Sequence, residues 1–288
     1  HRFDISEMNQ STRELHNARD GIIEGDGNYV DHLYQQRCES EWDCLQPQSQ
    51  GGAGGGDRHI GIALTRLQPY SDGPVFVKQL RESGGWDAVN AVYENPPAST
   101  EQTIYPEKYG EDEPTEVTVR DTSSDAWTTP DMGNGSVDYA SFGEAGLYTM
   151  LWYPSYAETQ RTGAPASVVV PVNHPLRPAQ NQETLDLYNY SYRYTAGWDG
   201  DKLVPYATNT SQEDGQTGYV WKSVWDSSED AEEFAEGYRQ LLDHHGAERV
   251  DAQTARYRIP EGANGVADAV RVTVQDDTVV IVNARTVD

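Results

Sequence analysis

The chain has 288 residues, enough for one large domain or two modest ones. Its 47 acidic residues outnumber the 21 basic ones, only four of which are lysines, and give a formal net charge of −26. This charge excludes binding to bare nucleic acid, whose phosphates would repel the chain, and with the scarcity of lysine it is typical of proteins that work in near-saturating salt. The acids are spread along the chain, which favours a halophilic protein over an acidic protein with an interaction tail.

The first predicted element is a helix over residues 12–36, where apolar residues recur at helical spacing. Gly21, Gly25 and Gly27 lie inside that pattern, and each glycine costs about 1 kcal/mol of helix stability relative to alanine. Three glycines in one helix indicate close packing against another backbone, or a site. A loosely formed helix with a break near Gly25 is the alternative.

Two cysteines follow this helix, Cys38 and Cys44. A short loop of this size can close as a disulfide, whereas two cysteines alone make a poor zinc site, because structural zinc takes four ligands. We therefore predict a Cys38–Cys44 disulfide and an oxidising compartment. The glycine- and glutamine-rich stretch at 46–58 predicts a loop.

Export is supported by four Asn-x-Ser/Thr acceptor sequons, at Asn9, Asn134, Asn189 and Asn209. No apolar run approaches the ~20 residues of a transmembrane segment. The chain starts at His1, with neither a signal peptide nor an initiator methionine. We expect an extracellular or cell-surface protein whose precursor carried an export signal.

The middle of the chain predicts helices over 74–82 and 85–93, separated by Gly84-Gly85. Ser99 and Gln102 fit a capping box that opens another helix. A strand is expected at 116–120 and an apolar helix at 142–153.

The C-terminal part is predicted to be richer in strands, at 166–172, 203–206, 218–225, 255–259, 269–274 and 278–283, with one amphipathic helix over 227–245. We therefore expect an α+β fold, with a mainly helical region at 1–165 followed by a region at 166–288 in which a small antiparallel sheet packs on one long helix.

No self-sufficient catalytic motif is present. None of the seven histidines is spaced as His-Glu-x-x-His, and there is no Gly-x-Ser-x-Gly elbow. One polar row stands out, because Asp20, Glu24, Asn28 and His32 are four apart and share one face of the first helix. The row could face a metal, or it could be an ordinary solvated face.

A resemblance bears on this row. Glu24-Gly25-Asp26-Gly27 is similar to the Glu-Gly-Asp-Ala motif of exported gluzincin-type zinc peptidases of halophilic archaea and bacteria, and His1-Arg2-Phe3-Asp4 resembles the end of that family's tail after its metal-binding helix. Further matching stretches occur in the same order along the chain: Gln68-Pro69-Tyr70, Gly84-Gly85-Trp86, Ala88-Val89-Asn90, 97–102, Pro106-Glu107-Lys108-Tyr109, Gly143-Glu144-Ala145-Gly146, 197–201 and Val224-Trp225-Asp226.

The resemblance implies that Glu24 is a zinc ligand, that Asp26 is a carboxylate orienting another ligand, and that a peptide is the substrate. It also implies that the two histidine ligands and the general base lie upstream of His1. Tyr105 stands where the family often has a histidine, so a role for Tyr105 as a hydrogen-bond donor to an oxyanion is open, and a packed aromatic ring is the alternative.

Two functions from other classes remain. The chain could be an extracellular structural subunit that contacts cell-surface components, as in a surface layer or filament, on a scaffold that has lost its chemistry. It could also be a binding module for peptides or glycans that needs no zinc. A homo-oligomer is compatible with each of these functions.

Overall fold

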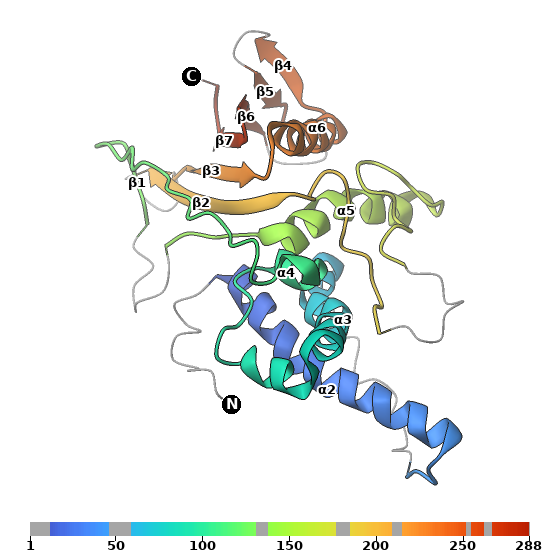
Figure 1. Cartoon of the computed structure of the whole chain (residues 1–288). Coiled ribbons are helices and arrows are strands. Elements are labelled where there is room, and N and C mark those ends of the chain that lie inside the picture. The colour runs from blue at the N-terminus through green and yellow to red at the C-terminus, as the bar shows by residue number, and fades with distance from the viewer. Residues whose placement is uncertain are drawn as a thin grey trace.

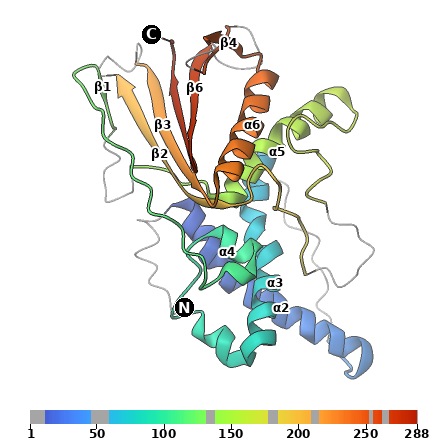
Figure 2. The same ribbon diagram turned by 45° about the horizontal axis from the view of Figure 1, so that its top comes forward.

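The structure is a computed structural model, and it describes residues 12–45, 59–130, 138–176, 185–208, 215–251, 255–261 and 267–287. The predicted loop at 46–58, the His1–Asp4 stretch and the sequons at Asn9, Asn134 and Asn209 lie outside these ranges. The fold is α+β, as predicted: helices come first and a seven-stranded antiparallel sheet follows. In Figures 1 and 2, helix α5 lies between the other N-terminal helices and the sheet.

The helical part is built from α2 (Arg13–Ser40), α3 (Ile60–Ala91), the short α4 (Thr100–Ile104), a 3-10 turn η1 (Pro106–Lys108) and α5 (Gly143–Thr162). Helix α2 runs through all three of its glycines, so the alternative of a break near Gly25 is wrong. Helix α3 begins well before residue 74, and α5 extends past residue 153. The prediction made both helices too short because proline normally disfavours a helix interior, yet Pro69 and Pro74 lie inside α3 and Pro154 lies inside α5.

Helices α2 and α3 cross at their glycines. A Cβ added to Gly25 would lie 2.4 Å from the carbonyl oxygen of Gly73, and one added to Gly73 would lie 2.3 Å from the carbonyl oxygen of Gly21. Side chains at these positions would therefore hold the two backbones apart. The close approach lets Ile22 pack with Phe76 and Val77 in a buried cluster.

Two local predictions about helix ends are confirmed. The Ser99 side chain accepts a hydrogen bond from the backbone N–H of Gln102 at 3.3 Å and caps α4. The expected break in α3 is present, because Gly84 and Gly85 have non-helical dihedrals and Gly85 has a φ of 69°, in the left-handed region that favours glycine.

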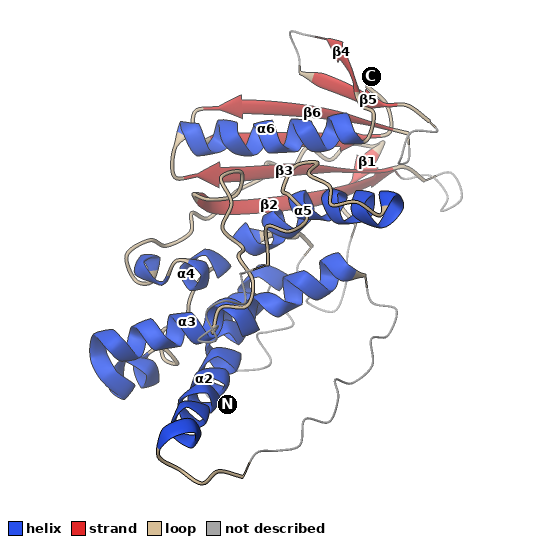
Figure 3. Cartoon of the chain, turned by 90° about the vertical axis from the view of Figure 1, so that its right-hand side faces the viewer, coloured by secondary structure: helices blue, strands red, loops and turns tan. Residues whose placement is uncertain are grey.

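The sheet has the strand order β1-β2-β3-β7-β6-β5-β4, and every neighbouring pair is antiparallel. The strands are β1 (Trp127–Thr128), β2 (Trp198–Thr208), β3 (Thr217–Trp225), β4 (Glu248–Asp251), β5 (Arg256–Ile259), β6 (Asp268–Gln275) and β7 (Thr278–Ala284). Helix α6 (Ser228–His244) covers one face of the sheet (Figure 3). Its Phe234 stacks on Trp225 at 4.7 Å between ring centroids.

Two predicted strands are wrong. Residues 166–172 bond to α5 instead of to a strand: the N–H of Val168 donates to the Ser155 hydroxyl at 2.8 Å, and the indole N–H of Trp152 donates to the carbonyl of Val172 at 3.0 Å. Residues 116–120 also form no strand, although Val117 is buried against the bulged start of β2. In both segments packing alone accounts for the β-branched residues that suggested strands.

The predicted disulfide is present. Cys38 and Cys44 are bonded, and the bridge closes the chain back onto the C-terminal end of α2. None of the described helices combines the length and apolar character that crossing a membrane requires.

Candidate functional site

Glu24 and Asp26 flank Gly25 at the helix crossing, where the Glu24 carboxylate lies beside Tyr70 of α3 and the Asp26 carboxylate bonds Tyr93 in the turn after α3. Glu24 is half-buried, and its carboxylate, together with burial, raises the pKa of Tyr70 on α3. The hydroxyl of Tyr93 donates to Asp26 at 3.0 Å. Burial and the Asp26 charge together raise the pKa of Tyr93 to about 12. The Glu24-Gly25-Asp26 triplet therefore joins two helices as well as carrying the candidate ligand.

The remaining members of the polar row bond along their own helix. The Asn28 amide donates to the backbone carbonyl of Glu24 at 2.7 Å, and the His32 ring lies 2.9 Å from the Gln36 amide. Asp20 is half-buried, and burial raises its pKa. These contacts are the ones that an ordinary polar helix face makes.

The described residues do not make a zinc site by themselves. A catalytic zinc takes three protein ligands, and Glu24 belongs to no group of three His, Cys, Asp or Glu side chains in the described ranges that could hold a metal. A zinc bound by Glu24 would need ligands from elsewhere in the protein. We therefore assign no step of peptide hydrolysis to the described residues.

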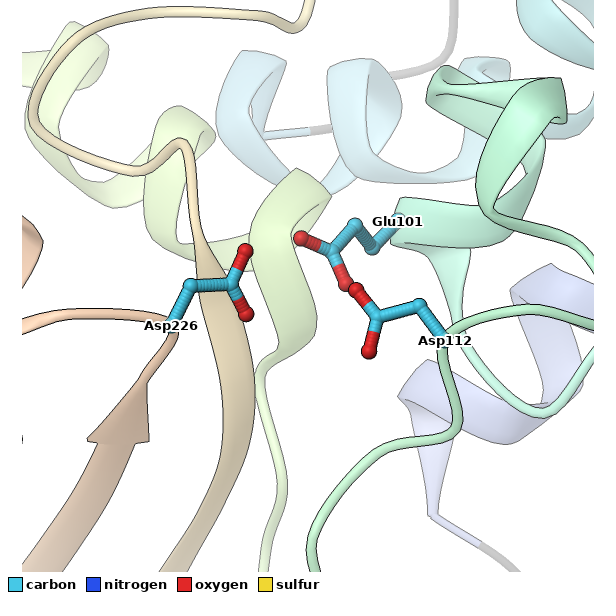
Figure 4. A group of neighbouring side chains, drawn as sticks. All are labelled: Glu101, Asp112 and Asp226. Carbon is cyan, nitrogen blue, oxygen red and sulfur yellow. The ribbon is translucent and has the colours of Figure 1, made fainter.

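The described residues do gather three carboxylates at another place, those of Glu101, Asp112 and Asp226 (Figure 4). The Lys108 ammonium lies among them, 2.7 Å from Glu101, 2.9 Å from Asp112 and 2.7 Å from Asp226. An ammonium has three N–H donors, so each carboxylate can take one. Lys108 thus provides the positive charge that a metal would bring, and the cluster joins α4 and η1 to the end of β3.

Tyr105 is held in a buried polar network. Its hydroxyl lies 3.0 Å from the Glu144 carboxylate and 2.6 Å from the Ser191 hydroxyl. Burial and the neighbouring Glu144 charge raise the pKa of Tyr105. These bonds run to α5 and to the segment before β2, and they give Tyr105 the packed, hydrogen-bonded environment of a structural residue.

Asn189, whose sequon lies in the described ranges, belongs to the same network. Its side-chain oxygen accepts a hydrogen bond from the backbone N–H of Ser191 at 3.1 Å, so the sequon is part of the folded turn.

Asp201, at the end of the 197–201 stretch, has a buried carboxylate that accounts for the aromatic residue and the final aspartate of that stretch. Asp201 accepts hydrogen bonds from five donors at 3.0–3.1 Å, namely the backbone N–H groups of Phe142 and Gly143, the Ser141 hydroxyl and the indole N–H groups of Trp198 and Trp221. Burial raises the pKa of Asp201, while these donors lower it. Asp201 thereby fixes the start of α5 against β2 and β3.

Glu14 and Glu144 are two further buried acids in this part of the molecule. Glu14 accepts hydrogen bonds from the backbone N–H and the hydroxyl of Thr100, and burial raises its pKa to about 8. Gly143 lies so close that a Cβ there would overlap the Glu14 carboxylate, and its φ of 64° also favours glycine. Glu144 is fully buried, and burial together with the Glu101 charge raises its pKa well above the usual range.

These raised pKa values predict that stability falls as pH rises. Glu14 has a pKa of about 8 when folded and 4.5 as the reference value, so the folded protein holds a proton that the unfolded chain releases. The resulting stabilisation is fully present below pH 4.5 and is lost as pH rises through about 8. Glu14→Gln should flatten the decline of unfolding free energy between these limits by up to about 1.4 kcal/mol per pH unit.

Chemical denaturation at fixed molar salt and several pH values measures this slope. The control is Glu39→Gln, which removes an exposed carboxylate from the same helix and should leave the slope unchanged. Equal slopes for wild type and Glu14→Gln would show that Glu14 is ionised in the folded protein.

Residues 129–288 match the model of a protein family described as a domain of unknown function, DUF8575. The chain belongs to this family. No curated protein and no solved structure matches the chain.

The DUF8575 match begins just after β1 and covers α5, α6 and strands β2 to β7. Within this DUF8575 protein, Glu144, Asp201 and Asp226 lie inside the matched region, whereas Glu24, Asp26 and Tyr105 precede it. The buried acids Glu144 and Asp201 are therefore part of the family domain. The similarity to zinc peptidases, whose implied ligand residues Glu24 and Asp26 precede the matched region, stays a prediction.

Sequence reasoning missed Lys108, Glu101, Glu14 and Asp201 as site-forming residues. Lys108 carried a signal, since it is one of four lysines in a very acidic chain and stands four residues before Asp112. Nothing in the local sequence predicts that Asp226 joins them, because that contact depends on how the sheet is placed against α4.

Proposed function

We propose that this protein works outside the cell as a zinc-peptidase-like protein of a halophile, in which Glu24 supplies one carboxylate ligand. The observation that carries the proposal is the position of Glu24, half-buried on α2, with its carboxylate close enough to the Tyr70 hydroxyl of α3 to raise the pKa of that tyrosine. Metal-binding carboxylates commonly have a polar group beside them that can orient them. The neighbouring Gly25 lets α2 approach α3 closely at Gly73, which places Glu24 beside α3.

Two further observations support a location outside the cell. The Cys38–Cys44 disulfide favours an oxidising compartment, because cytosolic thiols are kept reduced. The net charge of −26 suits an environment in which salt screens the repulsion between acids.

Zinc analysis of the full-length protein tests the role of Glu24. We expect about one zinc per chain in the wild type, and Glu24→Gln should weaken zinc binding at least about tenfold. The control Glu39→Gln removes an exposed carboxylate farther along α2 and should keep the metal. A zinc-free wild type, or equal zinc in wild type and Glu24→Gln, would contradict the proposal.

A surface-assembly subunit is the second candidate, and the tip of α2 favours it. Trp42 and Leu45, beside the disulfide, are 45% and 90% exposed, and Arg37 lies over the Trp42 ring at 4.9 Å. Figure 1 shows this end of α2 projecting from the rest of the molecule. Exposed apolar residues on a projecting segment that a disulfide holds are typical of surfaces that contact other proteins. Regular polymers formed by zinc-free protein, and weakened by Trp42→Ser, would favour this candidate.

A further inference from the structure

An apolar groove of about 570 Å³ lies where the starts of α2 and α3 meet α5 and the end of α6. Its apolar lining includes Ile62, Phe142, Met150, Tyr153 and Leu241. Ile62 is 58% exposed, although isoleucine is among the residues most often buried. The volume falls in the range of small-molecule and peptide-side-chain sites, roughly 300–1,000 Å³.

The charge of the lining is opposite to that of the protein. Among the residues that the structure describes, no aspartate or glutamate lines this groove, although the chain has 47 acidic residues. Its basic side chains, among the described residues, are those of Arg13, His59 and His245. The His59 ring packs 4.5 Å from the Tyr153 ring and contacts Gly61, which keeps it beside the apolar lining. An apolar ligand with an anionic end complements such a surface.

Three hydroxyl groups in the lining favour a ligand that carries hydrogen-bond donors. Thr65 and Thr149 donate to the carbonyls of Gly61 and Ala145, and Ser141 donates to Asp201. All three residues also line the groove, and a hydroxyl oxygen that donates one hydrogen bond can still accept another. Amide N–H groups of a peptide can use these acceptors, whereas a plain acyl chain cannot.

We propose that this groove binds the C-terminal residues of an apolar peptide, with the carboxylate at Arg13 and the side chains on the Ile62–Tyr153 surface. The site is separate from the proposed metal ligand, since Arg13 precedes Glu24 by three turns of α2, about 16 Å along the helix. The peptide site needs neither zinc nor Glu24, so the two proposals can fail independently.

Calorimetric titration in molar NaCl with N-acetyl-Leu-Phe tests the site. The free acid should bind saturably and roughly tenfold more tightly than its C-terminal amide, because the amide loses one charge-assisted hydrogen bond. Arg13→Gln should abolish this preference while apolar binding remains. Ile62→Glu, which puts a carboxylate on an exposed position in the groove, should abolish binding. Val30→Glu makes the same change at a 48% exposed site on α2 and should leave binding intact.

Circular dichroism of each variant confirms that it is folded before the titration. No saturable binding to the wild type would overturn the proposal, including the case in which other residues of the chain fill the groove. Equal binding to Ile62→Glu and wild type would also overturn it. Tighter binding of octanoate than of N-acetyl-Leu-Phe would identify an acyl-chain site and exclude the peptide.

Discussion

Replacing Gly25 with alanine should destabilise the protein by on the order of 4 kcal/mol, enough to unfold a marginally stable domain. The new Cβ would lie 2.4 Å from the oxygen and 2.5 Å from the carbon of the Gly73 carbonyl. Both are backbone atoms of a helix, so no side-chain rotation can relieve the overlap. The helices would have to separate, which would open the buried packing of Ile22 against Phe76.

Gly27→Ala is the matched control, since Gly27 is in the same helix and an added Cβ would meet no other described part of the chain within 4 Å. This change should leave stability unchanged or raise it by up to about 1 kcal/mol, because alanine favours helix. Thermal unfolding in molar salt, followed by circular dichroism, compares the two variants. Equal melting temperatures for Gly25→Ala and wild type would show that the α2–α3 crossing is looser than described.

Lowering the salt concentration should unfold the wild-type protein. The formal charge of −26 is screened over roughly 3 Å at 1 M salt but over roughly 10 Å at 0.1 M, so repulsion between surface acids grows as salt is removed. Helix α6 shows the arrangement locally, because Glu229 and Glu233, and likewise Glu232 and Glu236, are four residues apart on the helix. Arg193 and Arg239 offset part of this repulsion.

A salt titration at neutral pH, followed by far-ultraviolet circular dichroism, measures the effect. The helical signal should be lost as NaCl falls from molar concentrations towards 0.1 M, where the Debye length is ~10 Å. Tetramethylammonium chloride at equal ionic strength serves as the control and should protect equally well if screening is the cause. A signal that stays flat down to about 0.1 M would contradict the halophilic interpretation.

The elements that sequence predicted best are those with a strong local cause. The apolar stripe of α6 lies in a core cluster that includes Phe234, and Ser227 caps that helix, as its position before an acidic first turn suggests. The three glycines of the first helix predicted close backbone contact, and two of them, Gly21 and Gly25, lie against Gly73 at the α2–α3 crossing. Strands β6 and β7 also follow from local pattern.

The remainder depends on contacts between distant residues. The valines at 166–172 suggested a strand, yet hydrogen bonds to α5 replace the ladder. Strand β2 is longer than predicted, because Gly200 and Asp201 disfavour strands by propensity but are held by the buried hydrogen bonds of Asp201. The domain boundary after residue 165 stays a prediction, although β1 from the earlier region pairs with β2.

The candidate site could be predicted only in part for the same reason. Glu24 and Asp26 were singled out by a resemblance, and the structure adds their partners Tyr70 and Tyr93. These partners are distant in sequence and meet α2 only through the glycine crossing. This dependence suggests why Gly25 stands between the two carboxylates. Any larger residue at position 25 would push α2 away from α3 and separate Glu24 and Asp26 from Tyr70 and Tyr93.

The location of bound metal tests the central proposal most directly. Crystals of the full-length protein, grown with zinc, can be measured on both sides of the zinc absorption edge. We expect an anomalous peak within about 2.2 Å of a Glu24 carboxylate oxygen, the usual zinc–carboxylate distance. A peak confined to other residues, or no peak in zinc-containing crystals, would contradict a metal-binding role for Glu24 and leave the surface-assembly function as the better account.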